Sequence, residues 1–218
     1  MRTVIAPRLA LSLALPLALL LSVAPWHAGR ATSITVNGLS FSDEGGGFRL
    51  VSASGSGSRT DPYVVVEEFT GPEAAIMVVR GLASRLTMDK GTIALQAAGF
   101  ALRKVVVNRT GAAWQLFDME LREKLDLPSD YHDGLSFDQI HSAPRPFRAD
   151  RFALSDVVDE PFDYVRFSHG IVQPGETVTF NVTVTDTSPR DQFYLIQRPR
   201  RPIADDLKHG HRRFAFNR

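Results

Sequence analysis

The chain has 218 residues and no cysteine, and its 25 basic and 24 acidic residues nearly cancel. The charge is uneven along the chain, because residues 32–197 carry 15 basic against 22 acidic groups, whereas residues 198–218 carry seven against two. An acidic body argues against nucleic acid as its partner, and the absence of cysteine excludes a scaffold held by disulfides.

The N-terminus predicts a secretory signal peptide over residues 1–31. A basic start precedes an apolar run over residues 9–24, which is too short for a membrane span and is interrupted by Pro16. The small residues Gly29 and Ala31 predict cleavage after Ala31. We therefore expect a periplasmic or secreted protein with no membrane span after signal removal. An uncleaved anchor is the alternative.

Short strands are predicted at the start of the mature chain, over residues 33–36, 48–53, 61–69 and 74–80. The last two are rich in β-branched and aromatic residues and are separated by Gly71-Pro72, so they predict a hairpin. Turns recur every ten or so residues without a convincing amphipathic helix. This spacing predicts an all-β fold, an antiparallel β-sandwich of immunoglobulin-like or jelly-roll-like type, in one domain over residues 32–199.

Two central segments fit either a strand or a helix. Residues 81–101 are rich in alanine, which favours a helix, but Gly91 and Gly99 weaken that interpretation. Residues 114–125 place apolar side chains at helical spacing as well. We predict strands for both, in the case of residues 114–125 because turn-rich sequence flanks them.

The clearest strand covers residues 177–185. Valine and phenylalanine alternate there with threonine and asparagine, which is the pattern of a strand with one buried face. Residues 104–121 predict a second strand-rich block, and residues 193–196 predict a strand that completes the core. Beyond it, residues 200–218 predict a flexible basic tail that could touch anionic lipid or acidic polysaccharide.

The longest irregular region, residues 126–150, holds the candidate metal ligands. Asp130, Asp133 and Asp138 are carboxylates of the kind that bind Ca²⁺ in exported proteins, although their spacing matches no known calcium loop. Turn formation is the ordinary explanation of the same residues. The histidines are too scattered to predict zinc. The sequence therefore predicts no cofactor, with Ca²⁺ at these carboxylates as the alternative.

Catalytic motifs are weak. The sequence has no cysteine and no Gly-x-Ser-x-Gly elbow. Neighbouring carboxylates such as Glu67 and Glu68 point to opposite faces of a strand, whereas Asp118 and Glu120 share one face, where a solvated edge is the ordinary explanation. Trp114 is predicted to lie in the core, with a sugar-stacking platform as the alternative.

Several short blocks resemble bacterial exported β-sandwich proteins that carry a Pro-Glu-Pro C-terminal sorting tail. The blocks lie within residues 104–199 and are 106–111 with Trp114, 136–137, 170–180 and 193–199. The resemblance implies an exported sandwich in which an Asn-x-Thr-Gly-x-x-Trp strand pairs with a Pro-Gly-x-x-x-x-Phe strand. No Pro-Glu-Pro motif follows Pro199, which implies free secretion or periplasmic residence rather than anchoring.

These observations predict a non-catalytic interaction protein of the bacterial envelope or extracellular space. The expected partners are envelope polysaccharide or protein. The alternative is a glycan-binding module or a carbohydrate-active enzyme, supported by calcium through the loop at residues 126–141.

Overall fold

The computed structural model describes residues 31–85, 98–129, 132–138, 147–158 and 163–201. This part of the chain consists of β-strands and one short 3₁₀ helix, η1 (Leu82–Arg85). The strands are β1 (Ser33–Val36), β2 (Leu39–Ser42), β3 (Arg49–Ser54), β4 (Tyr63–Phe69), β5 (Ala75–Arg80), β6 (Ala98–Asn108), β7 (Leu116–Arg122), β8 (Leu135–Ser136), β9 (Arg148–Ala149), β10 (Phe152–Val158), β11 (Tyr164–Gly170), β12 (Thr177–Asp186) and β13 (Gln192–Arg200).

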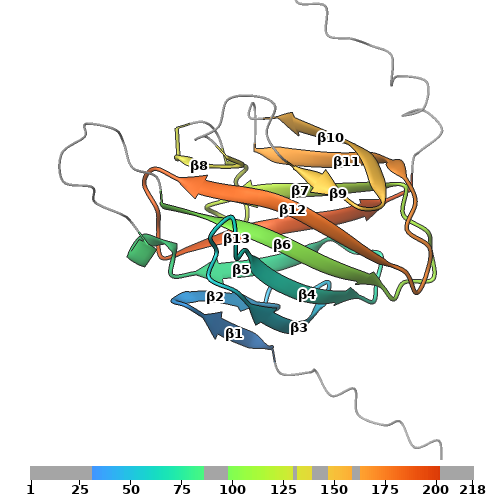
Figure 1. Ribbon diagram of the computed structural model, residues 1–218, viewed down its shortest axis with the longest axis horizontal. Helices are drawn as coiled ribbons and strands as arrows, with labels where there is room; N and C mark the ends of the chain where they lie inside the picture. The colour runs from blue at the N-terminus through green and yellow to red at the C-terminus, as the bar shows by residue number, and fades with distance from the viewer. Residues whose placement is uncertain (1–30, 86–97, 130–131, 139–146, 159–162, 202–218) are drawn as a thin grey trace, which may run out of the picture. The chain divides into compact units, whose positions relative to one another are not determined.

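The strands form two sheets. The seven-stranded sheet has the order β1-β2-β5-β13-β7-β11-β10, and the six-stranded sheet has the order β3-β4-β6-β12-β8, with β9 also paired to β12. Figure 1 shows β3, β4, β6 and β12 side by side. All strand pairs are antiparallel except β4 and β6, which are parallel. The prediction of an all-β sandwich is confirmed.

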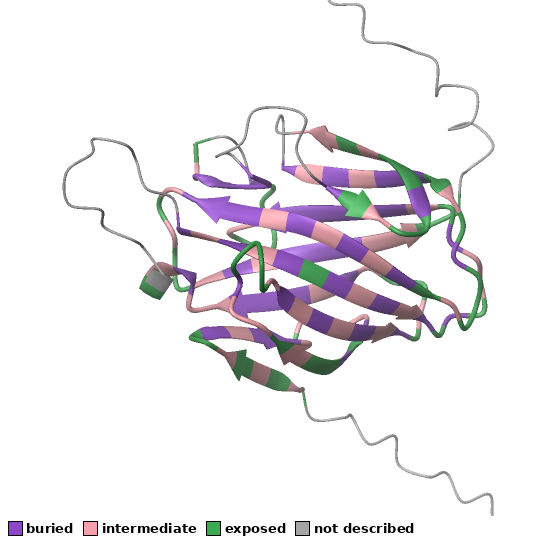
Figure 2. Cartoon of the chain, viewed as in Figure 1, coloured by how far each residue is buried: buried purple, intermediate pink, exposed green. Residues whose placement is uncertain are grey.

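The core lies between the two sheets because each strand buries every second side chain. Buried and partly exposed residues alternate along β4, β6 and β12, as the colours in Figure 2 show. Aromatic rings from the two sheets meet in the middle, where Phe180 of β12 lies 4.5 Å from Phe117 of β7 and 4.8 Å from Phe167 of β11, between ring centroids. Trp114 is buried within this core, as predicted.

The strand prediction for residues 61–80 is correct, but the predicted hairpin is wrong. β4 pairs with β3 and β6 in one sheet, whereas β5 pairs with β2 and β13 in the other. The chain therefore crosses between sheets at residues 70–74. Gly47 lies against this corner at a φ of 84°, and a Cβ there would meet the Ala74 carbonyl oxygen at 2.3 Å. Only glycine fits so close to that backbone.

The two segments that fit either a strand or a helix form different structures. Residues 116–122 form β7, so the strand prediction for this part is confirmed. Residues 82–85 form the 3₁₀ helix η1, so the strand prediction fails there, while residues 98–101 belong to β6. Residues 86–97 lie outside the described part of the chain.

Asn108 organises the turn that carries the chain from β6 to β7. Its side-chain nitrogen donates hydrogen bonds to the carbonyl oxygens of Ala112, at 2.8 Å, and Val172, at 3.1 Å. Its oxygen accepts hydrogen bonds from the backbone nitrogen and the hydroxyl of Thr110. Trp114 and Val172 then exchange backbone hydrogen bonds. The Asn-x-Thr-Gly-x-x-Trp block is thus a turn, anchored by the buried Asn108, that takes the chain from the six-stranded sheet to the seven-stranded sheet.

Within the described residues, no helix is long and apolar enough to cross a membrane.

Candidate functional site

The candidate metal ligands in the loop at residues 126–150 lie in different environments. Asp133 accepts a hydrogen bond from the backbone nitrogen of Leu135 at 2.9 Å, as a turn-forming aspartate does. Asp138 is fully buried and has a φ of 53°. Asp130 lies outside the described residues. Among the residues described, no three metal-binding side chains gather into one group. Calcium binding by Asp130, Asp133 and Asp138 stays a prediction.

A depression of about 280 Å³ lies beside this loop, next to Glu123, Asp133 and Arg190. Asp186 is buried close by at the end of β12. Burial, with the nearby carboxylates of Glu123 and Asp133, raises the pKa of Asp186 to about 6, against the opposing effects of the Ser188 backbone N–H and of Arg190. This carboxyl group therefore ionises at a higher pH than an exposed aspartate does.

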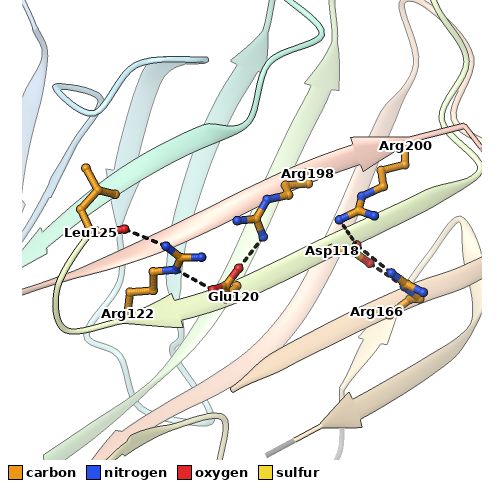
Figure 3. A network of polar contacts seen from close by, with 7 residues as sticks. All are labelled: Asp118, Glu120, Arg122, Leu125, Arg166, Arg198 and Arg200. Carbon is orange, nitrogen blue, oxygen red and sulfur yellow. Dashed lines mark hydrogen bonds and ion pairs between the residues drawn. The ribbon is translucent and has the colours of Figure 1, made fainter. Parts of the chain in front are cut away.

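A more extensive arrangement of charged side chains lies on the outer face of the seven-stranded sheet. Asp118 and Glu120 of β7 share a face, as the alternation predicts, but they do not form a solvated edge. β7 lies inside the sheet between β13 and β11, and both residues are buried. Four guanidinium groups cover them (Figure 3). We call this set the arginine ladder: Asp118, Glu120, Arg122, Arg166, Arg198 and Arg200.

Asp118 occupies one end of the ladder. Arg166 of β11 donates two hydrogen bonds to its carboxylate, at 2.8 Å to Oδ1 and 3.0 Å to Oδ2. Arg200 of β13 forms an ion pair with Oδ2 at 3.1 Å. The bidentate geometry holds the guanidinium of Arg166 in a fixed plane.

Glu120 occupies the other end. Arg122 donates a hydrogen bond to its Oε1, and Arg198 of β13 donates one to its Oε2, both at 2.5 Å. Arg122 also donates to the carbonyl oxygen of Leu125 at 2.7 Å. Three strands thus supply the ladder, because β13, β7 and β11 are neighbours and residues two apart on a strand share a face.

The exposed part of the ladder is cationic. The two carboxylate side chains are 5 % and 7 % exposed, whereas the arginine side chains range from 18 % at Arg122 to 46 % at Arg200. Four positive charges lie over two negative ones. Asp156 of β10 lies opposite Arg166 in the strand register and marks the edge of this surface. A guanidinium carries five donors in a planar fork, so the ladder can offer fixed donors to carboxylate or phosphate oxygens.

The sequence indicated only part of this site. Alternation along β7 was enough to place Asp118 and Glu120 on one face. The arginines come from β11 and β13, about 50 and 80 residues further along the chain, and nothing in the sequence states that these strands flank β7. To predict the whole site, one would have to know which distant strands pair, and the sequence does not show this.

A second buried polar group lies in the core and was missed by the sequence analysis. Glu67 points inward while its neighbour Glu68 points outward and pairs with Arg49 and Arg109, as predicted for adjacent residues on a strand. Lys104 is also fully buried and forms an ion pair with Glu67. Burial lowers the pKa of Lys104 well below its usual range. The sequence feature that could have revealed this group is Lys104 itself, a lysine at an inward-facing position between Leu102 and Val106 in a strand that alternates buried and exposed residues.

Comparison with known proteins yields no match: no family model, no curated protein and no solved structure is significantly similar to the chain.

Proposed function

We propose that the chain is a non-catalytic interaction protein of the bacterial envelope, and that its arginine ladder binds an acidic polysaccharide. The observation that carries the proposal is the exposure of four guanidinium groups above two buried carboxylates. The buried carboxylates fix the directions of the arginine side chains before a ligand arrives. A preorganised set of donors loses less side-chain entropy on binding than free surface arginines do.

The spacing of the ladder suits a polymer with repeated carboxylate groups. Arg198 and Arg200 are two residues apart on one strand, which corresponds to about 7 Å along the strand. Arg166 reaches the same face from β11, on the far side of β7. The ladder therefore presents cations both along one strand and across neighbouring strands of the sheet. Such an array favours an extended acidic chain over a single small anion.

The chain that follows the ladder has the same charge. After Arg200 at the end of β13, the sequence continues with Arg201, Lys208, Arg212, Arg213 and Arg218 against two aspartates. A basic segment that follows the ladder in the sequence adds cations for the same polymer. The acidic remainder of the body directs such a ligand toward this surface.

The enzyme alternative is less well supported by these carboxylates. Asp118 and Glu120 are the same-face pair that glycoside hydrolysis would need, but each is ion-paired with two arginines and neither is open to a substrate. In a hydrolase one of them would have to donate a proton. We therefore assign the pair a positioning role for the guanidinium groups.

Binding of the purified chain to polygalacturonate, with neutral dextran as the comparison, tests the proposal. Replacing Arg166 and Arg198 together by glutamine is expected to weaken binding at least tenfold and to reduce its sensitivity to salt. The matched control is Arg103→Gln, because Arg103 is exposed on the six-stranded sheet. Equal binding of dextran, or an equal loss in the Arg103 variant, would contradict the proposal.

A further inference from the structure

Three polar side chains meet in the core between the two sheets. Glu67 lies on β4 and Lys104 on β6, in the six-stranded sheet, and Gln197 lies on β13 in the other sheet. All three are 0 % exposed. Their partners in the strand register are apolar: Val65 lies beside Lys104, and Ala75 and Met119 flank Gln197. The group is therefore shielded from water.

Glu67 contacts both of the other residues. Its Oε1 touches the Nζ of Lys104 in the buried ion pair, and its Oε2 accepts a hydrogen bond of 2.9 Å from the Nε2 of Gln197. The Gln197 Oε1 is buried and accepts no hydrogen bond from the described residues. One carboxylate thus lies between an amine and a carboxamide, with the amide carbonyl left unsatisfied.

This arrangement contains the parts of an amide-forming reaction. Desolvation of Lys104 favours the neutral amine, which is a nucleophile. A carboxamide is a better acceptor for that amine than an ionised carboxylate, because the negative charge of a carboxylate repels nucleophiles. Glu67 can accept a proton at Oε1 and deliver one from Oε2, so it fits the role of general base and general acid.

We propose that Lys104 and Gln197 form an intramolecular amide bond with Glu67 as the proton carrier. The Nζ of Lys104 attacks the Cδ of Gln197, and the Nζ–Cδ bond forms as the Cδ–Nε2 bond breaks. Glu67 takes the proton released from Nζ and gives it to Nε2, which leaves as ammonia. No oxidation or reduction occurs, and no further reactant is needed.

The bond would connect the two sheets covalently. Lys104 and Gln197 are 93 residues apart in sequence and lie on facing layers. The chain has no cysteine, so no disulfide can perform this task. A buried ion pair alone is a weak source of stability, since an apolar pair of similar size often stabilises a core as well or better. A covalent product explains why polar groups occupy these positions.

Intact-mass spectrometry of the purified, denatured chain tests the proposal directly. We expect a mass 17 Da below the mass of the processed sequence, because one ammonia is lost. Peptide mapping must then find the peptides containing Lys104 and Gln197 joined to each other. Mapping is essential, because ring closure at Asn37-Gly38 also releases ammonia. An unchanged mass, a loss confined to Asn37-Gly38, or an 18 Da loss joining Lys104 to Glu67 would overturn the proposal.

Three variants separate the roles of the residues. Gln197→Glu keeps the shape of the side chain but replaces the leaving ammonia by water, so its product, where it forms, loses 18 Da. Glu67→Ala removes the proton carrier, and we expect the full unlinked mass. Lys104→Met supplies the unlinked reference for denaturing gel electrophoresis, in which the linked chain should migrate faster. The mass of the unmodified chain decides the question even where a variant fails to fold.

Discussion

At the scale of single residues, the clearest consequence of the structure is the pH dependence that Asp186 introduces. Its pKa rises from 3.8 to about 6 on folding, mainly through burial. The native state therefore holds a proton more tightly than the unfolded state does. Its contribution to stability is present below pH 3.8 and is lost as the pH rises through 6, where the buried carboxylate ionises.

Asp186→Asn tests this effect. The amide keeps an oxygen to accept the 2.8 Å hydrogen bond from the backbone nitrogen of Ser188, and it cannot ionise beside Glu123 and Asp133. We expect the variant to melt several degrees higher than the original chain at pH 8, with the difference shrinking toward zero at pH 4. Thermal unfolding by circular dichroism at several pH values measures it. A difference that does not change with pH would exclude ionisation as its cause.

At the scale of elements, the turn around Asn108 gives the next prediction. Asn108→Asp removes the two donations to the carbonyl oxygens of Ala112 and Val172 and puts a carboxylate oxygen against them. Asn108 is fully buried, so water cannot replace the lost partners. We expect a loss of roughly 3 kcal/mol in the free energy of unfolding, by analogy with other broken buried networks.

Denaturant unfolding monitored by Trp114 fluorescence measures this loss, since the tryptophan follows the turn directly. Asn181→Asp is the control. Asn181 lies on β12 among side chains that alternate with the buried ones, and its side-chain oxygen accepts a hydrogen bond from the exposed Arg103. A carboxylate there can keep that contact. A similar loss in both variants would show that the turn has no special importance.

The sequence predicted the positions of strands better than it predicted which strands pair with each other. The alternation of apolar and polar residues identified residues 177–185 as a strand, because each side chain is apolar or polar according to the face on which it lies. The strand β12 contains the whole segment. Which strands pair with each other depends on segments that are distant in the sequence. The strands β4 and β5 follow each other in sequence yet belong to different sheets, and β4 pairs in parallel with β6. Neither the arginine ladder nor the core group around Lys104 could be assembled without those pairings.

At the scale of the whole molecule, the two sheets are joined by aromatic packing. Phe180 of β12 contacts Phe117, Phe167 and Phe152, whose strands β7, β11 and β10 all belong to the seven-stranded sheet. It is fully buried. A single side chain from one sheet thus packs against three strands of the other sheet. The stability of each sheet then depends on the presence of the opposite one, because an isolated sheet exposes its apolar face.

Phe180→Ala should therefore destabilise the entire sandwich rather than one strand. Removing a buried phenylalanine costs about 3–5 kcal/mol, through lost apolar burial and the cavity left between the rings. Leu154→Ala is the control, because Leu154 of β10 is 48 % exposed and its truncation should change stability by less than about 0.5 kcal/mol. Denaturant titrations followed by far-ultraviolet circular dichroism and by Trp114 fluorescence measure both variants. If the sheets depend on each other, the two signals shift together to lower denaturant in Phe180→Ala and still coincide. Separate transitions would mean that one sheet persists without the other and would contradict the inference that the aromatic contacts unite them.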